Sequence, residues 1–217
     1  MLLITKSKAD SKELLDPTAA AWSSIPASDL PLKGTPLGTQ PTPYTRTIFK
    51  GRKVGAVPGV QLKACHNGQA VFIHLAWTDA TENRGEGNGV FPDGAAVIFP
   101  VGADAPINTM GSKQLPVNAW QWRADATEGQ SVVAHGLGTT EPTGDRVSVQ
   151  AARAGGRWQV VIARDLLGAD PGNTSVSLTP GGTTRLGIAI WEGSHGERAG
   201  FKAYTESWTD AKLAAAN

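Results

Sequence analysis

The residue of this sequence best suited to bind a soft metal is Met110. It is the only methionine besides Met1, and it lies within the long segment 100–116, flanked by a threonine and a glycine rather than by apolar residues. A methionine in such a place often does no more than fill a gap in the packing. Its thioether sulfur is also a ligand for a soft metal ion or for haem iron. Spacing along the chain does not decide between these two roles.

Two tryptophans are predicted to share one face of a strand over residues 117–124. Trp120 and Trp122 are alternate residues, and alternate side chains of a strand point to the same side. Two indoles in line are most common in a protein core, but they also form sugar-stacking platforms and walls of pockets for planar cofactors. Arg123 follows on the opposite face or just beyond the strand. There it is either a solvated arginine or a partner for a carboxylate such as a haem propionate.

A lysine near the C-terminus has a similar ambiguity. Lys202, Tyr204 and Glu206 alternate within the strand-like segment 200–208 and are expected on one face. This pattern is usual for a protein surface, and it gains a functional meaning only where that face closes a pocket.

Motifs of several other classes are missing from the sequence. Its four histidines, His195 among them, lack the close spacing of a zinc pair, so a zinc hydrolase is not expected. Cys65 is the sole cysteine, which excludes an intrachain disulfide and a multi-cysteine zinc or iron–sulfur site. Covalent attachment of a c-type haem is excluded as well, because Leu62 stands where the second cysteine would be.

Composition narrows the range of partners. The 217 residues are 40% hydrophobic, and Lys+Arg 20 balance Asp+Glu 19, so the chain has no strong electrostatic signature. Neither a nucleic acid nor a membrane surface is therefore expected as a partner. No apolar stretch approaches the roughly 20 residues that span a bilayer. The apolar start of the chain is too short for a signal peptide, so we expect either a cytoplasmic protein or a mature form whose export signal has been removed.

The period-two pattern predicts an all-β fold. Residues 71–77 alternate as in a buried strand, and further strands are predicted at 60–65, 94–99, 117–124, 131–135, 146–152, 157–164, 185–192 and 200–208. These short strands, with 26 glycines and 14 prolines between and around them, favour an antiparallel two-sheet β-sandwich with few short helices. We expect residues 1–43 to form an N-terminal arm packed on a domain of residues 44–217. The long loops 78–93 and 100–116 are where we expect a site.

An ordered set of segments resembles one known family. The segments are Asp93–Pro100, Met110-Gly111, Pro116–Asp125, Arg157–Leu166, Leu186–Gly193, and Lys202-Ala203-Tyr204 leading to Ser207-Trp208. In this order they resemble the haem b (gamma) subunits of the type II dimethyl sulfoxide reductase family. Those subunits serve ethylbenzene dehydrogenase, dimethyl sulfide dehydrogenase, selenate reductase and chlorate reductase.

The resemblance implies a β-sandwich that holds one non-covalent haem b between a methionine and a lysine. Carried over residue by residue, the methionine is Met110 and the lysine is Lys202. His195, seven residues before Lys202, is an alternative nitrogen ligand. Trp120, Trp122 and Arg123 are then expected to contribute to the cofactor pocket.

The resemblance also implies a role and partners. The subunit would relay electrons without catalysing a reaction, between a soluble periplasmic c-type cytochrome and an iron–sulfur beta subunit. The beta subunit in turn contacts the molybdenum catalytic alpha subunit, and the complex works in the periplasm. Two other hypotheses fit the residues less well: a carbohydrate-binding β-sandwich module, suggested by the tryptophans, and a metal-dependent lyase, which the lack of clustered carboxylates and paired histidines disfavours.

Overall fold

The fold is built from strands that follow one another in a continuous hydrogen-bonded path. The structure, a computed structural model, describes residues 1–40, 42–85, 87, 89–102 and 104–216. Within them the path runs β10-β11-β5-β4-β1-β14-β12-β6-β7-β8-β9. The bounds of these strands are β1 Leu2–Lys6, β4 Gly59–His66, β5 Ala70–Thr78, β6 Gly94–Pro100, β7 Val117–Arg123, β8 Gln130–Ala134, β9 Glu141–Pro142, β10 Ser148–Ala154, β11 Arg157–Asp165, β12 Thr183–Trp191 and β14 Thr209–Leu213.

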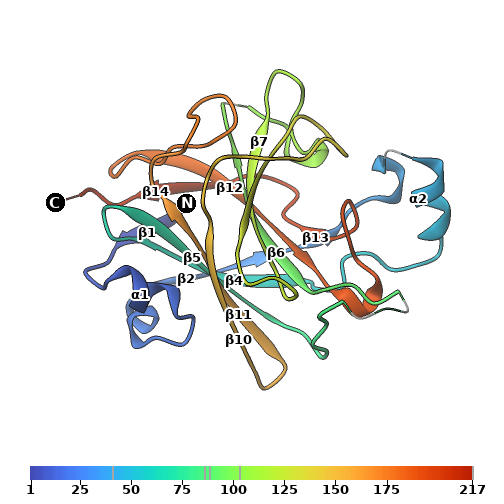
Figure 1. Ribbon diagram of the computed structural model, residues 1–217, viewed down its shortest axis with the longest axis horizontal. Coiled ribbons are helices and arrows are strands. Elements are labelled where there is room, and N and C mark those ends of the chain that lie inside the picture. The colour runs from blue at the N-terminus through green and yellow to red at the C-terminus, as the bar shows by residue number, and fades with distance from the viewer. Residues whose placement is uncertain (41, 86, 88, 103, 217) are drawn as a thin grey trace.

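Shorter elements complete the fold. The strands β2 Ala27–Pro31, β3 Lys33–Gly34 and β13 Ala203–Tyr204 pair with β4, with β13, and with both β12 and β3, respectively. Among the described residues, the two α-helices are short, α1 Ser11–Leu15 and α2 Pro43–Ile48, and lie at opposite ends of the molecule (Figure 1). The same part of the chain has four 3-10 turns, at Ala20–Ser24, Leu37–Thr39, Ile107–Thr109 and Gly193–His195. No helix among the described residues is both long and apolar enough to cross a membrane.

The strands form a sandwich around a core between two layers. Alternation turns Ile73, Leu75 and Trp77 of β5 toward the inward-facing residues of the other layer, such as Val97 and Trp120. All of these side chains are essentially inaccessible to water. The expected all-β sandwich is thereby confirmed, although β1 joins the two layers by parallel pairing with β4 on one side and β14 on the other.

Two segments differ from the expectation. Residues 1–43, expected as an arm packed on the domain, also supply β1, β2 and β3 to the sheets. Burial explains the difference, because Leu2 and Ile4 alternate into the main core. The predicted strand 200–208 is interrupted: only Ala203–Tyr204 is extended there, and β14 begins at Thr209.

The outer faces of the two layers are covered differently. Over β5 and β11, side chains of the N-terminal segment such as Leu14 and Trp22 pack on Phe72 and Val161. Over β6, β7 and β12, the outward residues are mostly small, and loops together with the short helix α2 surround them. The second arrangement leaves space, and that space is the candidate site.

Candidate functional site

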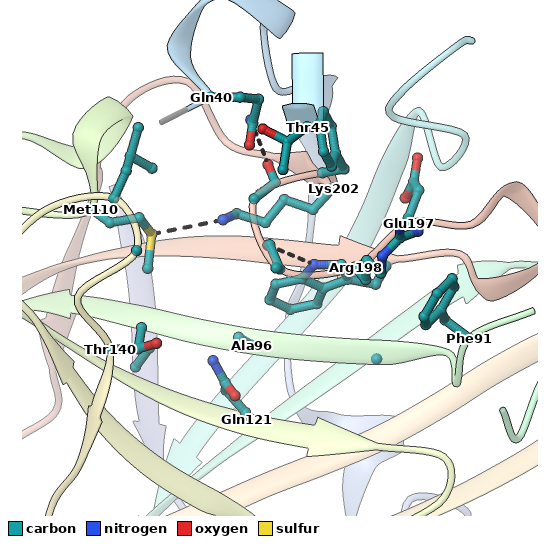
Figure 2. A pocket seen from close by; sticks show the side chains of 18 of the residues that line it. Gln40, Thr45, Phe91, Ala96, Met110, Gln121, Thr140, Glu197, Arg198 and Lys202 are labelled. Atoms are coloured by element: carbon teal, nitrogen blue, oxygen red, sulfur yellow. Dashed lines mark hydrogen bonds between the residues drawn. The ribbon is translucent and has the colours of Figure 1, made fainter. Parts of the chain in front are cut away.

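A cavity of about 510 Å³ lies on the outer face of the β6–β7–β12 layer. Its floor includes Gly94, Ala96 and Ile98 of β6 together with Ala119 and Gln121 of β7. The small side chains leave room above the sheet. The walls come from the segment around α2, from the two long loops that sequence had singled out, and from residues 136–140 and 197–202 (Figure 2).

Met110 and Lys202 face each other across this cavity. Lys202 Nζ lies 3.9 Å from Met110 Sδ, although the residues are 92 positions apart in the sequence. Figure 2 shows the two side chains reaching toward one another from the loop before β7 and from the segment just before β13. The structure thus brings together the two residues that the sequence analysis had paired.

The backbone around Met110 is held in an uncommon conformation. Met110 has φ 57 and ψ 48, the left-handed region, at the end of the 3-10 turn Ile107–Thr109. Its carbonyl accepts a hydrogen bond from Gly136 N at 3.0 Å. Gly111 follows with φ +80, and a Cβ there would come within 2.8 Å of the carbonyl oxygens of Leu115 and Ala134. Glycine is therefore required next to Met110, and the thioether is fixed by the turn rather than by packing alone.

Lys202 is buried without a carboxylate. Its residue is 4% exposed, and among the described residues no acidic group forms an ion pair with it. Besides the sulfur, its ammonium group lies 5.4 Å from the ring centroid of Trp191. Burial disfavours the charged form and lowers the pKa of Lys202 to about 8. The amine therefore gives up its proton, and exposes its lone pair, far more readily than an ordinary lysine.

Main-chain contacts fix the position of Lys202. Its N–H donates to Thr35 Oγ1 at 3.2 Å, and its carbonyl accepts from Thr35 N at 3.0 Å. Gln40 supports the adjacent turn by donating from Nε2 to the Gly200 carbonyl at 3.1 Å. The lysine is thus anchored by residues from the N-terminal part of the chain.

The two tryptophans of β7 both belong to the core. Trp120 is fully buried there, where its Nε1 donates to Asn118 Oδ1 at 2.8 Å, and it is not among the residues that line the cavity. Trp122 packs edge-on against Trp158 in the same core, with ring centroids 5.0 Å apart, and is also one of the residues that line the cavity. The expectation that both indoles form a cofactor wall therefore does not hold for Trp120. Alternate side chains of β7 point to opposite faces, so Ala119 and Gln121 face the cavity while Trp120 faces the core.

Arg123 and His195 lie at the periphery. Arg123 is on the cavity face of β7, but its guanidinium is already paired with Asp125 at 2.7 Å and its side chain is 58% exposed. The His195 side chain is 52% exposed, with Nδ1 3.6 Å from a Glu192 oxygen. It is not among the residues that line the cavity, so the geometry favours Lys202 over His195 as the nitrogen donor.

Several wall residues were not found from the sequence. Trp191, Phe49 and Arg198 all line the cavity, and although Trp191 lies in the family-like segment Leu186–Gly193, none of the three was expected at the site. They meet only because chain segments distant in sequence converge, as the contact between Gln40 and Gly200 illustrates. Trp191, at the outward end of β12, could have been singled out as a tryptophan beside a turn, but its neighbours could not.

Fold and cavity together define a β-sandwich that carries an apolar cavity on the outside of one sheet, lined by a methionine and a buried lysine. Solved structures with the same fold include a family 9 carbohydrate-binding module from Caldicellulosiruptor kristjanssonii in complex with cellotriose. It has a TM-score of 0.55 at 10% identity, and the match covers 99% of this chain and 93% of that one. A protein from Bacteroides uniformis described as carbohydrate-binding matches with a TM-score of 0.52 at 10% identity, over 98% of both chains. At such identities the likeness concerns the fold alone.

Sequence relatives are more informative. Residues 19–154 match the family described as ethylbenzene dehydrogenase. The chlorate reductase subunit gamma of Ideonella dechloratans is 34% identical over 201 residues, which cover 88% of this chain and 77% of the relative. A protein of Haloferax mediterranei described as a respiratory nitrate reductase heme subunit (ORF7) is 33% identical, over 88% of this chain and 65% of the relative. The dimethylsulfide dehydrogenase subunit gamma of Rhodovulum sulfidophilum is 30% identical, over 65% and 56% of the two chains.

The chain belongs to the ethylbenzene dehydrogenase family of gamma subunits. It spans just under two thirds of the length of the Haloferax relative. The relatives are named as subunits of reductases and dehydrogenases, which is consistent with a non-catalytic subunit of an oxidoreductase.

Proposed function

We propose that this chain is a haem b electron-transfer subunit of a molybdenum oxidoreductase, in which Met110 and Lys202 would be the ligands that hold the haem iron. The observation that carries the proposal is the pair itself. A thioether and a buried amine lie 3.9 Å apart in an apolar cavity, and the sulfur is the only hydrogen-bonding partner of the amine among the described residues. Burying an amine without a carboxylate partner destabilises the folded protein. Binding of a metal by that amine would account for its position.

The donor set fits a haem with a relay function. Bound between a soft thioether and a neutral amine, haem iron would favour the ferrous state and have no open position for substrate, so it would exchange electrons only. This chain's residues would supply the rest. The left-handed turn at Met110 would fix the position of its sulfur. The hydrogen bond to Thr35 and the strand pairing of Ala203 would fix the position of Lys202. The apolar walls would exclude water from the cavity.

The position of the single cysteine supports the proposal that the haem is held non-covalently. Cys65 is fully buried in β4 and packs in the cluster beneath α1, on the far layer of the sandwich. Burial also raises the pKa of its thiol to about 12. A thiol in that place has neither access to the cavity nor the reactivity to form a thioether link.

The partners are inferred from the family. We assign this chain to a complex with an iron–sulfur beta subunit and a molybdenum-containing alpha subunit, and to electron exchange with a soluble c-type cytochrome in the periplasm. Chlorate reductase is one complex of this kind, since its gamma subunit is among the relatives.

Reconstitution tests the proposal. The chain is produced without haem, titrated with ferric haem and then reduced. We expect a Soret band that sharpens and shifts on reduction, and a red colour that acidified acetone extracts completely. Lys202→Ala and Met110→Ala should each lose the low-spin ferric spectrum, whereas His195→Ala should keep it. A low-spin spectrum that survives Lys202→Ala but not His195→Ala would move the nitrogen ligand to His195.

A carbohydrate-binding module is the second candidate, because the solved structures of the same fold include such modules. Sugar platforms need exposed indole faces, but no tryptophan is among the exposed large hydrophobic side chains of the described residues. Retention of the haem-free protein on insoluble cellulose, in the absence of any Soret band after reconstitution, would support this candidate instead.

A further inference from the structure

Two arginines lie close to Phe49, which lines the cavity together with Phe91; Arg198 also lines the cavity, whereas Arg52 adjoins it through the Phe49 ring. The guanidinium carbon of Arg198 lies 4.2 Å from the ring centroid of Phe91 and 5.3 Å from that of Phe49. The guanidinium carbon of Arg52 lies 5.7 Å from the same Phe49 ring. Both groups point toward Gly196, where a Cβ would lie 3.6 Å from Arg52 Nη1 and 3.9 Å from Arg198 Nη1. Arg198 lines the cavity, and Figure 2 shows it beyond Lys202 on the side toward Phe91.

Neither guanidinium has a carboxylate partner among the described residues. Arg198 Nη1 donates to the Gly196 carbonyl at 3.0 Å, which leaves its other donors free. Glu197 is adjacent in sequence, but Gly55 N and Ala56 N donate to its Oε1 at 2.6 and 3.0 Å, and it forms no ion pair with either arginine. Both guanidinium groups lie near Gly196, and two like charges in one region repel each other, a repulsion that a bound anion would relieve.

Arg123 offers a contrast at the same cavity. Its Nε and Nη2 donate to the two oxygens of Asp125 at 2.9 and 2.7 Å, so this edge of the guanidinium already binds a carboxylate. The positive charge without an acidic partner among the described residues therefore lies at Arg198, which lines the cavity, and at Arg52 next to Phe49, although the sequence had pointed to Arg123.

We propose that Arg198 and Arg52 bind a carboxylate carried by the ligand of the cavity. This inference rests on the proposed function, under which that carboxylate is a haem propionate. Guanidinium groups bind carboxylates through two parallel hydrogen bonds, and the aromatic rings on either side of Arg198 restrict its orientation before a ligand arrives. The arginines would thus set which way round the ligand lies, while Met110 and Lys202 hold its centre.

The test compares two ligands that differ only in charge. Wild type, Arg198→Gln, Arg52→Gln and the distant control Arg157→Gln are each titrated with haem and with haem dimethyl ester, whose propionates are uncharged. Affinity is followed through the Soret band and through quenching of tryptophan fluorescence. A charge-assisted hydrogen bond contributes about 1.5–3 kcal/mol, so the wild type should bind haem roughly 10- to 100-fold more tightly than the ester.

The variants should abolish that preference selectively. We expect Arg198→Gln to bind haem as weakly as the ester while its ester affinity equals that of the wild type. Arg52→Gln should show a smaller loss, because this residue is more exposed, and Arg157→Gln should keep the full ratio. Arg198→Lys, which keeps the charge but not the planar fork, should retain part of the preference.

Other outcomes would overturn the assignment in distinguishable ways. An undiminished preference in Arg198→Gln, or an equal loss for haem and ester, would show that Arg198 acts through packing only. A preference abolished by Arg123→Gln instead would move the carboxylate to Arg123. Equal binding of both ligands by the wild type would refute this inference while the proposed function stands, and binding of neither would refute both.

Discussion

Replacing Lys202 with methionine should stabilise the ligand-free protein while destroying the site. Methionine is similar in length and carries no charge, so it can occupy the same apolar space. In the wild type, burial lowers the pKa of Lys202 from 10.5 to about 8. One pKa unit corresponds to 1.36 kcal/mol, so the buried cation costs the folded state roughly 3 kcal/mol at neutral pH. Lys202→Met should raise the free energy of unfolding by about that amount at pH 7.

The pH dependence is what identifies the cause. Below pH 8 the lysine is charged in both the folded and the unfolded chain, so the buried charge destabilises the folded state to its full extent. Between pH 8 and pH 10.5 the folded chain loses its proton before the unfolded chain does, so the stability of the wild type rises with pH. The advantage of Lys202→Met should therefore shrink across this window and vanish at its upper end.

Urea unfolding of the haem-free proteins at a series of pH values between 6 and 10.5 measures this difference. Ile98→Leu is the matched control, because Ile98 lines the same cavity, carries no titrating group and has no hydrogen bond with Lys202, so its effect should not vary with pH. An advantage of Lys202→Met that stays constant from pH 7 to pH 10 would come from apolar burial alone. It would contradict the claim that an uncompensated charge resides in the cavity.

Three further predictions concern other parts of the molecule. Met110→Ala should lower the reduction potential of the reconstituted haem by on the order of 100 mV, within the roughly 0.8 V that axial ligands span, and potentiometric titration measures it. Asp145→Ala should destabilise the protein by about 3–5 kcal/mol in urea unfolding, because it leaves Arg164, whose side chain is 1% exposed, without its ionic partner; a loss below 1 kcal/mol would show that the pair is dispensable. Burial raises the pKa of Asp93 from 3.8 to about 6, so the folded state binds its proton more tightly than the unfolded state does. As the pH falls from 6 to 3.8, the free energy of unfolding of the wild type should therefore rise by roughly 3 kcal/mol relative to that of Asp93→Asn. A difference between the two proteins that does not change with pH would refute the shift.

Strand alternation predicted most of the sandwich but not the face on which the ligand space lies. The patterns at 71–77, 94–99 and 117–124 correspond to β5, β6 and β7. Alternation defines two faces of a strand, yet it does not tell which face meets the other sheet. Trp120 was therefore assigned to the cavity, whereas the structure puts it in the core. Likewise, β1 pairs in parallel with β14, and this contact joins residues about 200 positions apart in the sequence. The local sequence pattern of either strand does not predict which strand it pairs with.

The pairing of Met110 with Lys202 was within reach of the sequence, whereas Arg198 was not. The methionine stood out by its rarity and the lysine by the family resemblance, and these two signals do not depend on knowing the fold. Arg198 is one of many arginines, and its meaning comes only from what surrounds it: two phenyl rings, a second guanidinium and no acid within ion-pair distance among the described residues.

The position of the cavity separates the stability of the sandwich from the occupancy of the site. On β6 and β7, inward side chains such as Val97, Phe99 and Trp120 are large and fill the space between the sheets, whereas the outward Ala96 and Ala119 are small. Because the large side chains complete their core without the cavity, the sandwich can fold around its own apolar residues before any ligand enters. The loops above the outward alanines then need only bring two donors and two arginines to the space that the alanines leave. A chain built in this way can fold although the buried Lys202 lowers its stability, because the apolar core between the sheets is complete without the cavity.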